Sequence, residues 1–130
     1  MNTKYVLIIL GEPYSTFSEI LGKYFKKNHK LGKKIILVGC KSLLQSQLKD
    51  LNLLFKLNEI KLIKYAKKNV VNIIDIKFNY KKIYSQVSNK SNNYIKKCFD
   101  IGLKILKKNN DIILITGPIT KKTFLKKKNI

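Results

Sequence analysis

The stretch that decides the fold is Asp111-Ile-Ile-Leu-Ile-Thr-Gly-Pro-Ile-Thr-Lys-Lys122. Its apolar run predicts a buried strand, and Thr116-Gly-Pro118 predicts a turn that leads into a short helix. A second strand-to-turn junction, Tyr5-Val-Leu-Ile-Ile-Leu-Gly-Glu-Pro13, lies near the N-terminus. If the two strands lie parallel in one sheet, both turns leave the sheet at the same edge. Ligands bind at that edge in open α/β sheets.

Strand and helix patterns alternate in the first part of the chain. Continuous apolar runs at 4–10 and 34–39 predict strands that are covered on both faces. A helix is expected between them, and another begins at Ser42. This alternation predicts βαβ units and a parallel sheet.

Thr16-Phe-Ser-Glu19 matches a capping box at the start of the first helix. The Thr16 side chain would accept a hydrogen bond from the backbone N–H of Glu19, and the Glu19 carboxylate would reach back. The helix is expected to run from about residue 17 to residue 28. Helical spacing predicts one apolar face, made of Phe17, Ile20, Leu21, Tyr24 and Phe25.

The middle of the chain is less regular. Residues 58–65 alternate in part and could form a strand, and residues 70–78 have β-branched strand character. Residues 79–93 are polar and predict a loop. A helix then follows to about residue 107. Its apolar stripe consists of Tyr94, Ile95, Cys98, Phe99, Gly102 and Leu106.

These elements predict an α/β fold with a parallel or mixed sheet flanked by helices, in a single domain over residues 1–130. The hydrophobic share of 45% is sufficient for a packed core. No apolar run reaches the roughly 18 residues that a membrane-spanning helix needs. The N-terminal apolar run lacks a small-residue cleavage site, so we expect a mature cytoplasmic protein.

The formal net charge of +21 suggests a polyanionic partner such as nucleic acid. All the basic residues other than the lone histidine are lysines, whereas specific phosphate and base recognition favours the arginine fork. The lysines are scattered and accompany many Ile and Asn residues, as an AT-rich genome would encode. The charge therefore favours compositional drift over a binding surface, with nonspecific, salt-sensitive attachment to polyanions.

The sequence assembles neither a metal site nor a catalytic triad. Cys40 and Cys98 lack metal-ligand spacing and are expected to be reduced and buried. His29 lies in a lysine-rich turn and is expected to be solvated. We therefore assign no catalytic and no metal-binding residue to this chain.

The two strand-to-turn junctions remain as candidate sites. A turn before a helix N-terminus leaves backbone N–H groups free for an anion, and a lysine can pair with a phosphate. The alternative is that both are ordinary turns, and for the first turn the spacing favours that alternative. The candidates for contact with a substrate or cofactor are Gly11, Glu12, Pro13, Thr116, Gly117, Pro118 and Lys121.

Taken together, Gly11-Glu-Pro13, Thr116-Gly-Pro-Ile-Thr-Lys121 and the order of elements between them resemble the start of the 4-hydroxythreonine-4-phosphate dehydrogenases, the PdxA family. The resemblance covers all 130 residues, but only about the first two-fifths of a typical member. It implies the N-terminal part of a fold similar to that of isocitrate and isopropylmalate dehydrogenases.

The resemblance also implies a function. Members oxidise 4-phosphooxy-threonine, a small phosphorylated substrate, with NAD on the route to pyridoxal phosphate. They are homodimers that hold a divalent metal by histidines, and the metal would polarise the substrate's hydroxyl group.

Two departures and one absence qualify that implication. Tyr14-Ser-Thr-Phe-Ser-Glu19 replaces a Gly-Ile-Gly-Pro run, and Thr120 stands where many members have His or Asn. The family's Gly-His-Thr-Glu motif and its metal-binding histidines belong downstream of Ile130. We therefore expect an N-terminal fragment of a two-domain enzyme that is inactive alone. The rival hypothesis is a small lysine-rich protein that binds nucleic acid or other polyanions.

Overall fold

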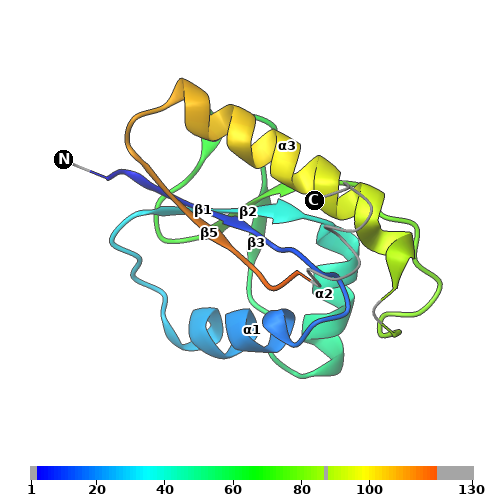
Figure 1. The fold of residues 1–130 in the computed structure, drawn as a ribbon. Coiled ribbons are helices and arrows are strands. Elements are labelled where there is room, and N and C mark those ends of the chain that lie inside the picture. The colour runs from blue at the N-terminus through cyan, green and yellow to red at the C-terminus, as the bar shows by residue number, and fades with distance from the viewer. Residues whose placement is uncertain (1–2, 87, 120–130) are drawn as a thin grey trace.

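Five parallel strands form one sheet in the computed structural model, which describes residues 3–86 and 88–119 (Figure 1). Every neighbouring pair in the order β3-β4-β2-β1-β5 is parallel. The predicted α/β class is therefore confirmed. The strands are β1 Tyr5–Ile9, β2 Lys34–Gly39, β3 Leu57–Glu59, β4 Val71–Asp75 and β5 Ile112–Thr116.

Helices cover both faces of the sheet. Helices α1 and α2 pack on one face, and α3 crosses the other (Figure 1). Two short 3-10 helices, η1 and η2, lie in the connections on either side of β4. The bounds are α1 Phe17–Lys27, α2 Lys41–Asp50, η1 Ile63–Tyr65, η2 Asn89–Ser91 and α3 Asn92–Lys108. No helix in the described ranges is both long and apolar enough to cross a bilayer.

The central strands are apolar on both faces, as their continuous apolar runs predict. In β1, Leu7 and Ile9 belong to the core under α3, whereas Ile8 belongs to the core under α1 and α2. Successive side chains of a strand point to opposite faces, so one run of apolar residues serves two cores. Ile95 and Cys98 of α3 are fully buried against the first core.

The predicted capping box at the start of α1 is wrong. Thr16 is the N-cap residue, but its side chain makes no capping hydrogen bond. The preceding hydroxyl acts instead, because Ser15 Oγ accepts a hydrogen bond from the backbone N–H of Phe17 at 3.2 Å. Glu19 forms an ion pair with Lys23 at 3.0 Å, one turn further along the helix.

The predicted apolar face of α1 is wrong in part. Leu21 and Phe25 are buried, but Ile20 is 59% exposed and Tyr24 is 56% exposed. The helix turns Leu21 and Phe25 toward the sheet, and no described element covers the neighbouring flank.

The prediction that the last strand is buried is also wrong. Strand β5 pairs only with β1 in the described part of the chain and forms one edge of the sheet. Ile112 and Leu114 pack toward the α3 core, but Ile113 is 45% exposed and Ile115 is 44% exposed. Neighbouring elements rather than the strand's own residues decide this burial.

The middle of the chain follows the predictions in outline. Residues 58–65 are not one strand: strand β3 covers Leu57–Glu59, and a 3-10 helix follows at Ile63–Tyr65. Strand β4 at Val71–Asp75 confirms the strand expected within 70–78. The predicted loop at 79–93 is irregular up to η2, and α3 begins within it at Asn92.

Candidate functional site

The two turns lie side by side at the carboxyl edge of the sheet, as predicted. Ile9 and Thr116 are register partners at the ends of β1 and β5. The backbone N–H of Gly117 donates to the Ile9 carbonyl oxygen at 2.7 Å, and that of Glu12 donates to the Pro118 carbonyl oxygen at 2.8 Å. Segments more than a hundred positions apart in the sequence thus form one hydrogen-bonded unit.

Both turn glycines are required by this contact. Gly11 has φ +75°, and a Cβ added there would lie 2.6 Å from the Pro118 carbonyl oxygen. A Cβ at Gly117 would overlap the Leu10 carbonyl oxygen. The glycines therefore allow two backbones to touch, which supports the reading of these residues as ordinary structural turns. Thr116 and Pro118 are exposed, whereas Pro13 is buried.

Glu12 is buried, with only 5% of its surface exposed. Its carboxylate accepts hydrogen bonds from Ser91 Oγ, at 3.2 and 3.4 Å to its two oxygens, and from the backbone N–H of Tyr14 at 3.4 Å. Burial raises the pKa of Glu12, and these two hydrogen bonds oppose the rise. Glu12 therefore ties the first turn to the residue before α3.

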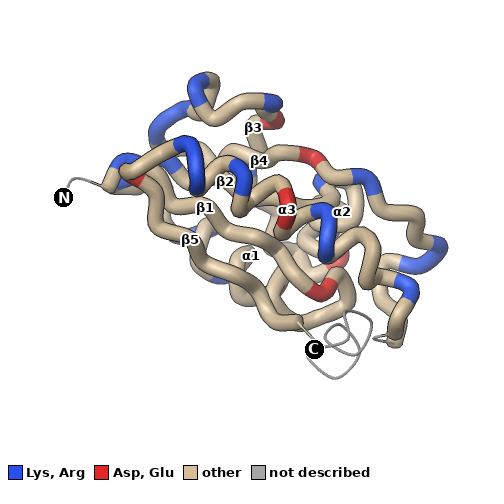
Figure 2. Tube along the Cα trace, turned by 45° about the horizontal axis from the view of Figure 1, so that its top comes forward, with Lys and Arg blue, Asp and Glu red and all other residues tan. Residues whose placement is uncertain are grey.

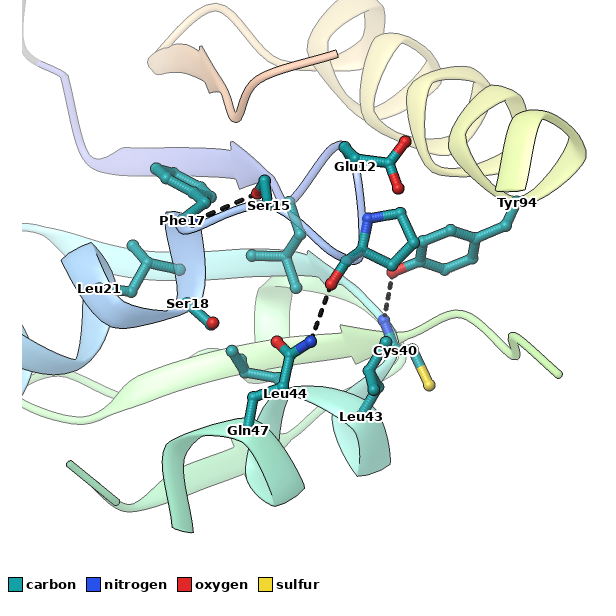
Figure 3. Close-up of a pocket in the computed structure, with 12 residues that line it drawn as sticks. Glu12, Ser15, Phe17, Ser18, Leu21, Cys40, Leu43, Leu44, Gln47 and Tyr94 are labelled. Carbon is teal, nitrogen blue, oxygen red and sulfur yellow. Dashed lines mark hydrogen bonds between the residues drawn. The ribbon is translucent and has the colours of Figure 1, made fainter. Parts of the chain in front are cut away.

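A small cavity lies beside this turn (Figure 3). Gln47 Nε2 donates to the Pro13 carbonyl oxygen at 2.9 Å on one side, and the backbone N–H of Cys40 donates to the Tyr94 hydroxyl at 2.7 Å on the other. The cavity measures about 20 Å³, and roughly one water fits in such a space. This cavity is therefore too small for a substrate.

Two larger hollows lie further along the same sheet edge, where the connection from β4 to α3 passes. They measure about 340 Å³ and about 300 Å³, within the range of ligand sites. Sequence reasoning missed them because residues 79–93 predict only a polar loop. The available signal was the pair Lys81-Lys82 set close to Phe78 and Tyr80.

The structure therefore brings together six of the seven residues predicted to contact a ligand, and Lys121 lies outside the described residues. The first turn meets the second turn on one side and η2 on the other. The polar partner Ser91 was not predicted, because it comes from an irregular segment 79 positions away from Glu12.

The described residues do not fit a divalent metal. They contain no cluster of three or more His, Cys, Asp or Glu side chains that could coordinate one. Cys40 and Cys98 are free and buried, as predicted, and burial raises the pKa of the Cys98 thiol to about 12. A thiol of that pKa is a poor nucleophile and a poor metal ligand at neutral pH.

Lysines are spread over the molecule rather than gathered on one face (Figure 2). They occur on α1, in the connection that contains η1, in the connection from β4 to η2, and along α3. This distribution favours compositional drift over a surface dedicated to nucleic acid.

No protein-family model matches the chain, and no curated protein matches it. Solved structures do match. A protein assigned as a 4-hydroxythreonine-4-phosphate dehydrogenase from Salmonella typhimurium superposes with a TM-score of 0.78 at 19% identity, over 99% of this chain and 41% of that one.

Two further matches carry the same description. The 4-hydroxythreonine-4-phosphate dehydrogenase from Burkholderia phymatum gives a TM-score of 0.78 at 12% identity, over 96% of this chain and 39% of that one. The enzyme from Klebsiella pneumoniae gives 0.73 at 16% identity, over 98% and 40%. The chain thus has the fold of about two-fifths of these proteins, in agreement with the resemblance in the sequence.

Proposed function

We propose that this chain supplies the N-terminal part of an NAD-dependent dehydrogenase that oxidises 4-phosphooxy-threonine in pyridoxal phosphate synthesis. The observation that carries the proposal is the joined pair of turns. The Gly-Glu-Pro and Thr-Gly-Pro turns, which carry the resemblance in the sequence, are hydrogen-bonded to each other at the ligand edge of the sheet. The similarity in fold to three such dehydrogenases supports it.

The proposed division of labour follows from the residues that are present. NAD, when bound, accepts the hydride, and the described residues form one wall of the site. The described part of the chain does not fit a metal, so we derive no metal-dependent step from it. In this proposal the metal ligands come from a part of the enzyme beyond the described residues, and the assembled enzyme is a cytoplasmic homodimer.

Exposed apolar side chains on β5 and α1 support a further part of this kind. Ile113 and Ile115 of β5 and Ile20 and Tyr24 of α1 are all about half exposed. Exposed apolar patches mark surfaces that another polypeptide covers. The dehydrogenases of similar fold have a further three-fifths of chain that this sequence does not match.

The first test is to read the DNA downstream of the Ile130 codon and to produce what it encodes together with this chain. We expect a coding region with a Gly-His-Thr-Glu motif and histidines, and NADH formation from the phosphorylated substrate only when both parts are present. The chain alone is the control and should form no NADH. Turnover by the chain alone, or a downstream region without these residues, would contradict the proposal.

A nucleic-acid-binding protein is the rival hypothesis, and the scattered lysines give it less support. Salt separates the two. If the charge reflects compositional drift, the chain should bind DNA or RNA without preference for sequence or structure, and moderate salt should abolish that binding. Selective binding that persists at moderate salt would favour the rival.

A further inference from the structure

The two larger hollows lie at a switch point of the sheet. Strands β2 and β4 are neighbours, but the chain leaves β2 for α2 on one face and leaves β4 for α3 on the other (Figure 1). Connections that diverge in this way open a crevice at the carboxyl ends of the strands, and nucleotides and other ligands bind in such crevices. The crevice here is bounded by Tyr14 after β1, by the residues after β4, and by Lys90 before α3.

The crevice is positively charged. Lys81, Lys82 and Lys90 line the larger hollow, and Lys90 also lines the smaller one. No Asp or Glu lines either hollow among the described residues. Lys77 also lines the smaller hollow, but its charge is paired, because its Nζ lies 2.9 Å from an Asp75 carboxylate oxygen. Three exposed lysines without a described ion-pair partner suit one phosphate or diphosphate group.

Aromatic rings form the other wall. Phe78 and Tyr80 are stacked, with centroids 6.4 Å apart and an interplanar angle of 25°. Tyr14 meets Phe78 edge-on at 6.0 Å, and the Tyr80 hydroxyl donates to Ser42 Oγ at 3.0 Å. Tyr14 and Tyr80 are half-buried, so one side of each ring packs and another remains accessible. Such rings form a surface on which a planar base can stack.

From this combination we infer that the crevice binds a mononucleotide unit, with the phosphate at Lys81, Lys82 and Lys90 and the base against Tyr80 and Tyr14. A volume of about 340 Å³ is in the range of sites for small ligands of this size. The inference deepens the proposed function. It rests on that proposal only in identifying the mononucleotide with half of a dinucleotide cofactor. The Gly-Glu-Pro turn does not form this site; it supports the crevice through Glu12 and Ser91.

The test titrates the 130-residue chain with AMP, ribose 5-phosphate and inorganic phosphate by calorimetry, at low and at moderate salt. AMP should bind about tenfold more tightly than ribose 5-phosphate, because stacking of a base on an aromatic ring accounts for roughly that factor. The triple variant K81A/K82A/K90A should weaken binding of both ligands about tenfold or more. Tyr80→Leu should remove the advantage of AMP and leave ribose 5-phosphate affinity unchanged.

Two controls match these variants. K67A/K68A/K107A removes three exposed lysines elsewhere, and Tyr65→Leu removes an exposed ring outside the crevice. Neither should change AMP affinity by more than about twofold. Equal affinities for AMP and ribose 5-phosphate would overturn the inference. So would equal losses in the crevice variants and their controls, which would indicate general attraction to a basic protein.

The site and the enzyme can fail separately. Specific AMP binding that disappears in the crevice variants, together with an assembled enzyme that forms no NADH, would leave the site in place and remove the proposed function. If the assembled enzyme forms NADH equally well with K81A/K82A/K90A and with the original chain, the proposed function stands and the crevice is not the cofactor site.

Discussion

At the scale of single residues, Gly11 is held by two independent constraints: its positive φ and the nearby Pro118 carbonyl oxygen. We predict that Gly11→Ala lowers the free energy of unfolding by about 1–3 kcal/mol, since left-handed backbone is strained in residues with a Cβ. Gly32→Ala is the matched control, because a Cβ there meets nothing within 4 Å. Urea denaturation measures both. Equal losses would show that the contact between the turns is unimportant for stability.

Glu12 gives a prediction that depends on pH. Its pKa in the folded state is raised from 4.5, first by burial. Stability from this group is therefore fully present below about pH 4.5 and is lost as the pH rises through the folded-state pKa. Glu12→Gln keeps an acceptor for Ser91 Oγ and removes the titration.

We predict that the stability of the original chain relative to Glu12→Gln falls as the pH rises above about 4.5 and through the raised folded-state pKa. Urea denaturation at several pH values measures that difference. Glu19→Gln removes a carboxylate on the surface and controls for the loss of one negative charge. A difference between the original chain and Glu12→Gln that stays constant with pH would contradict the assignment.

At the scale of elements, β5 is an edge strand that exposes Ile113 and Ile115. Exposed apolar edges promote association between copies, and a charge on such an edge prevents it. We predict that Ile115→Lys reduces the self-association of the chain, as measured by light scattering, without changing its circular dichroism. Leu62→Lys, which alters an exposed apolar residue away from the edge, should have little effect. Equal effects of the two variants would show that the edge is not the cause.

The same strand shows how far the sequence predicts the fold. Apolar runs predict β1, β2 and β5 and their parallel arrangement, because runs of this length alternating with helices have few other solutions. The exposure of β5 was not predictable, since an apolar run is the same in the centre of a sheet as at its edge. At the start of α1, the Ser15 hydroxyl and not the Thr16 hydroxyl accepts the backbone hydrogen bond. Either residue type can do so, and the local backbone geometry decides which one does.

The candidate site also has features that the sequence predicts and features that it does not. The meeting of the two turns follows from parallel strands, so it was predictable. The hydrogen bond between Glu12 and Ser91 spans 79 positions and depends on how an irregular segment is placed. The crevice was missed for the same reason, because its walls come from the segments after β1 and β4 and from the approach to α3, and no local pattern relates them.

At the scale of the whole molecule, the apolar residues define the fold, whereas the charged residues do not define a binding face. The positions of the apolar residues define a sheet with two cores and the fold of the dehydrogenases it resembles. The charge of +21 is spread over that fold and defines no single face. Within this surplus, the crevice combines lysines with stacked aromatic rings, a hollow of ligand size and an absence of acids among the described lining residues, at the carboxyl edge of the sheet.

The pairing of β1 with β5 also sets an order of events during translation. Strand β1 lies between β2 and β5, and β5 is the last of the described strands to leave the ribosome. Until it emerges, β1 has an unpaired edge, and Ile9 and Pro118 cannot accept the hydrogen bonds that join the turns. Nascent chains with such edges are the natural substrates of chaperones. The growing polypeptide thus first exposes the unpaired edge of β1. Once β5 has paired with β1, the exposed edge is that of β5.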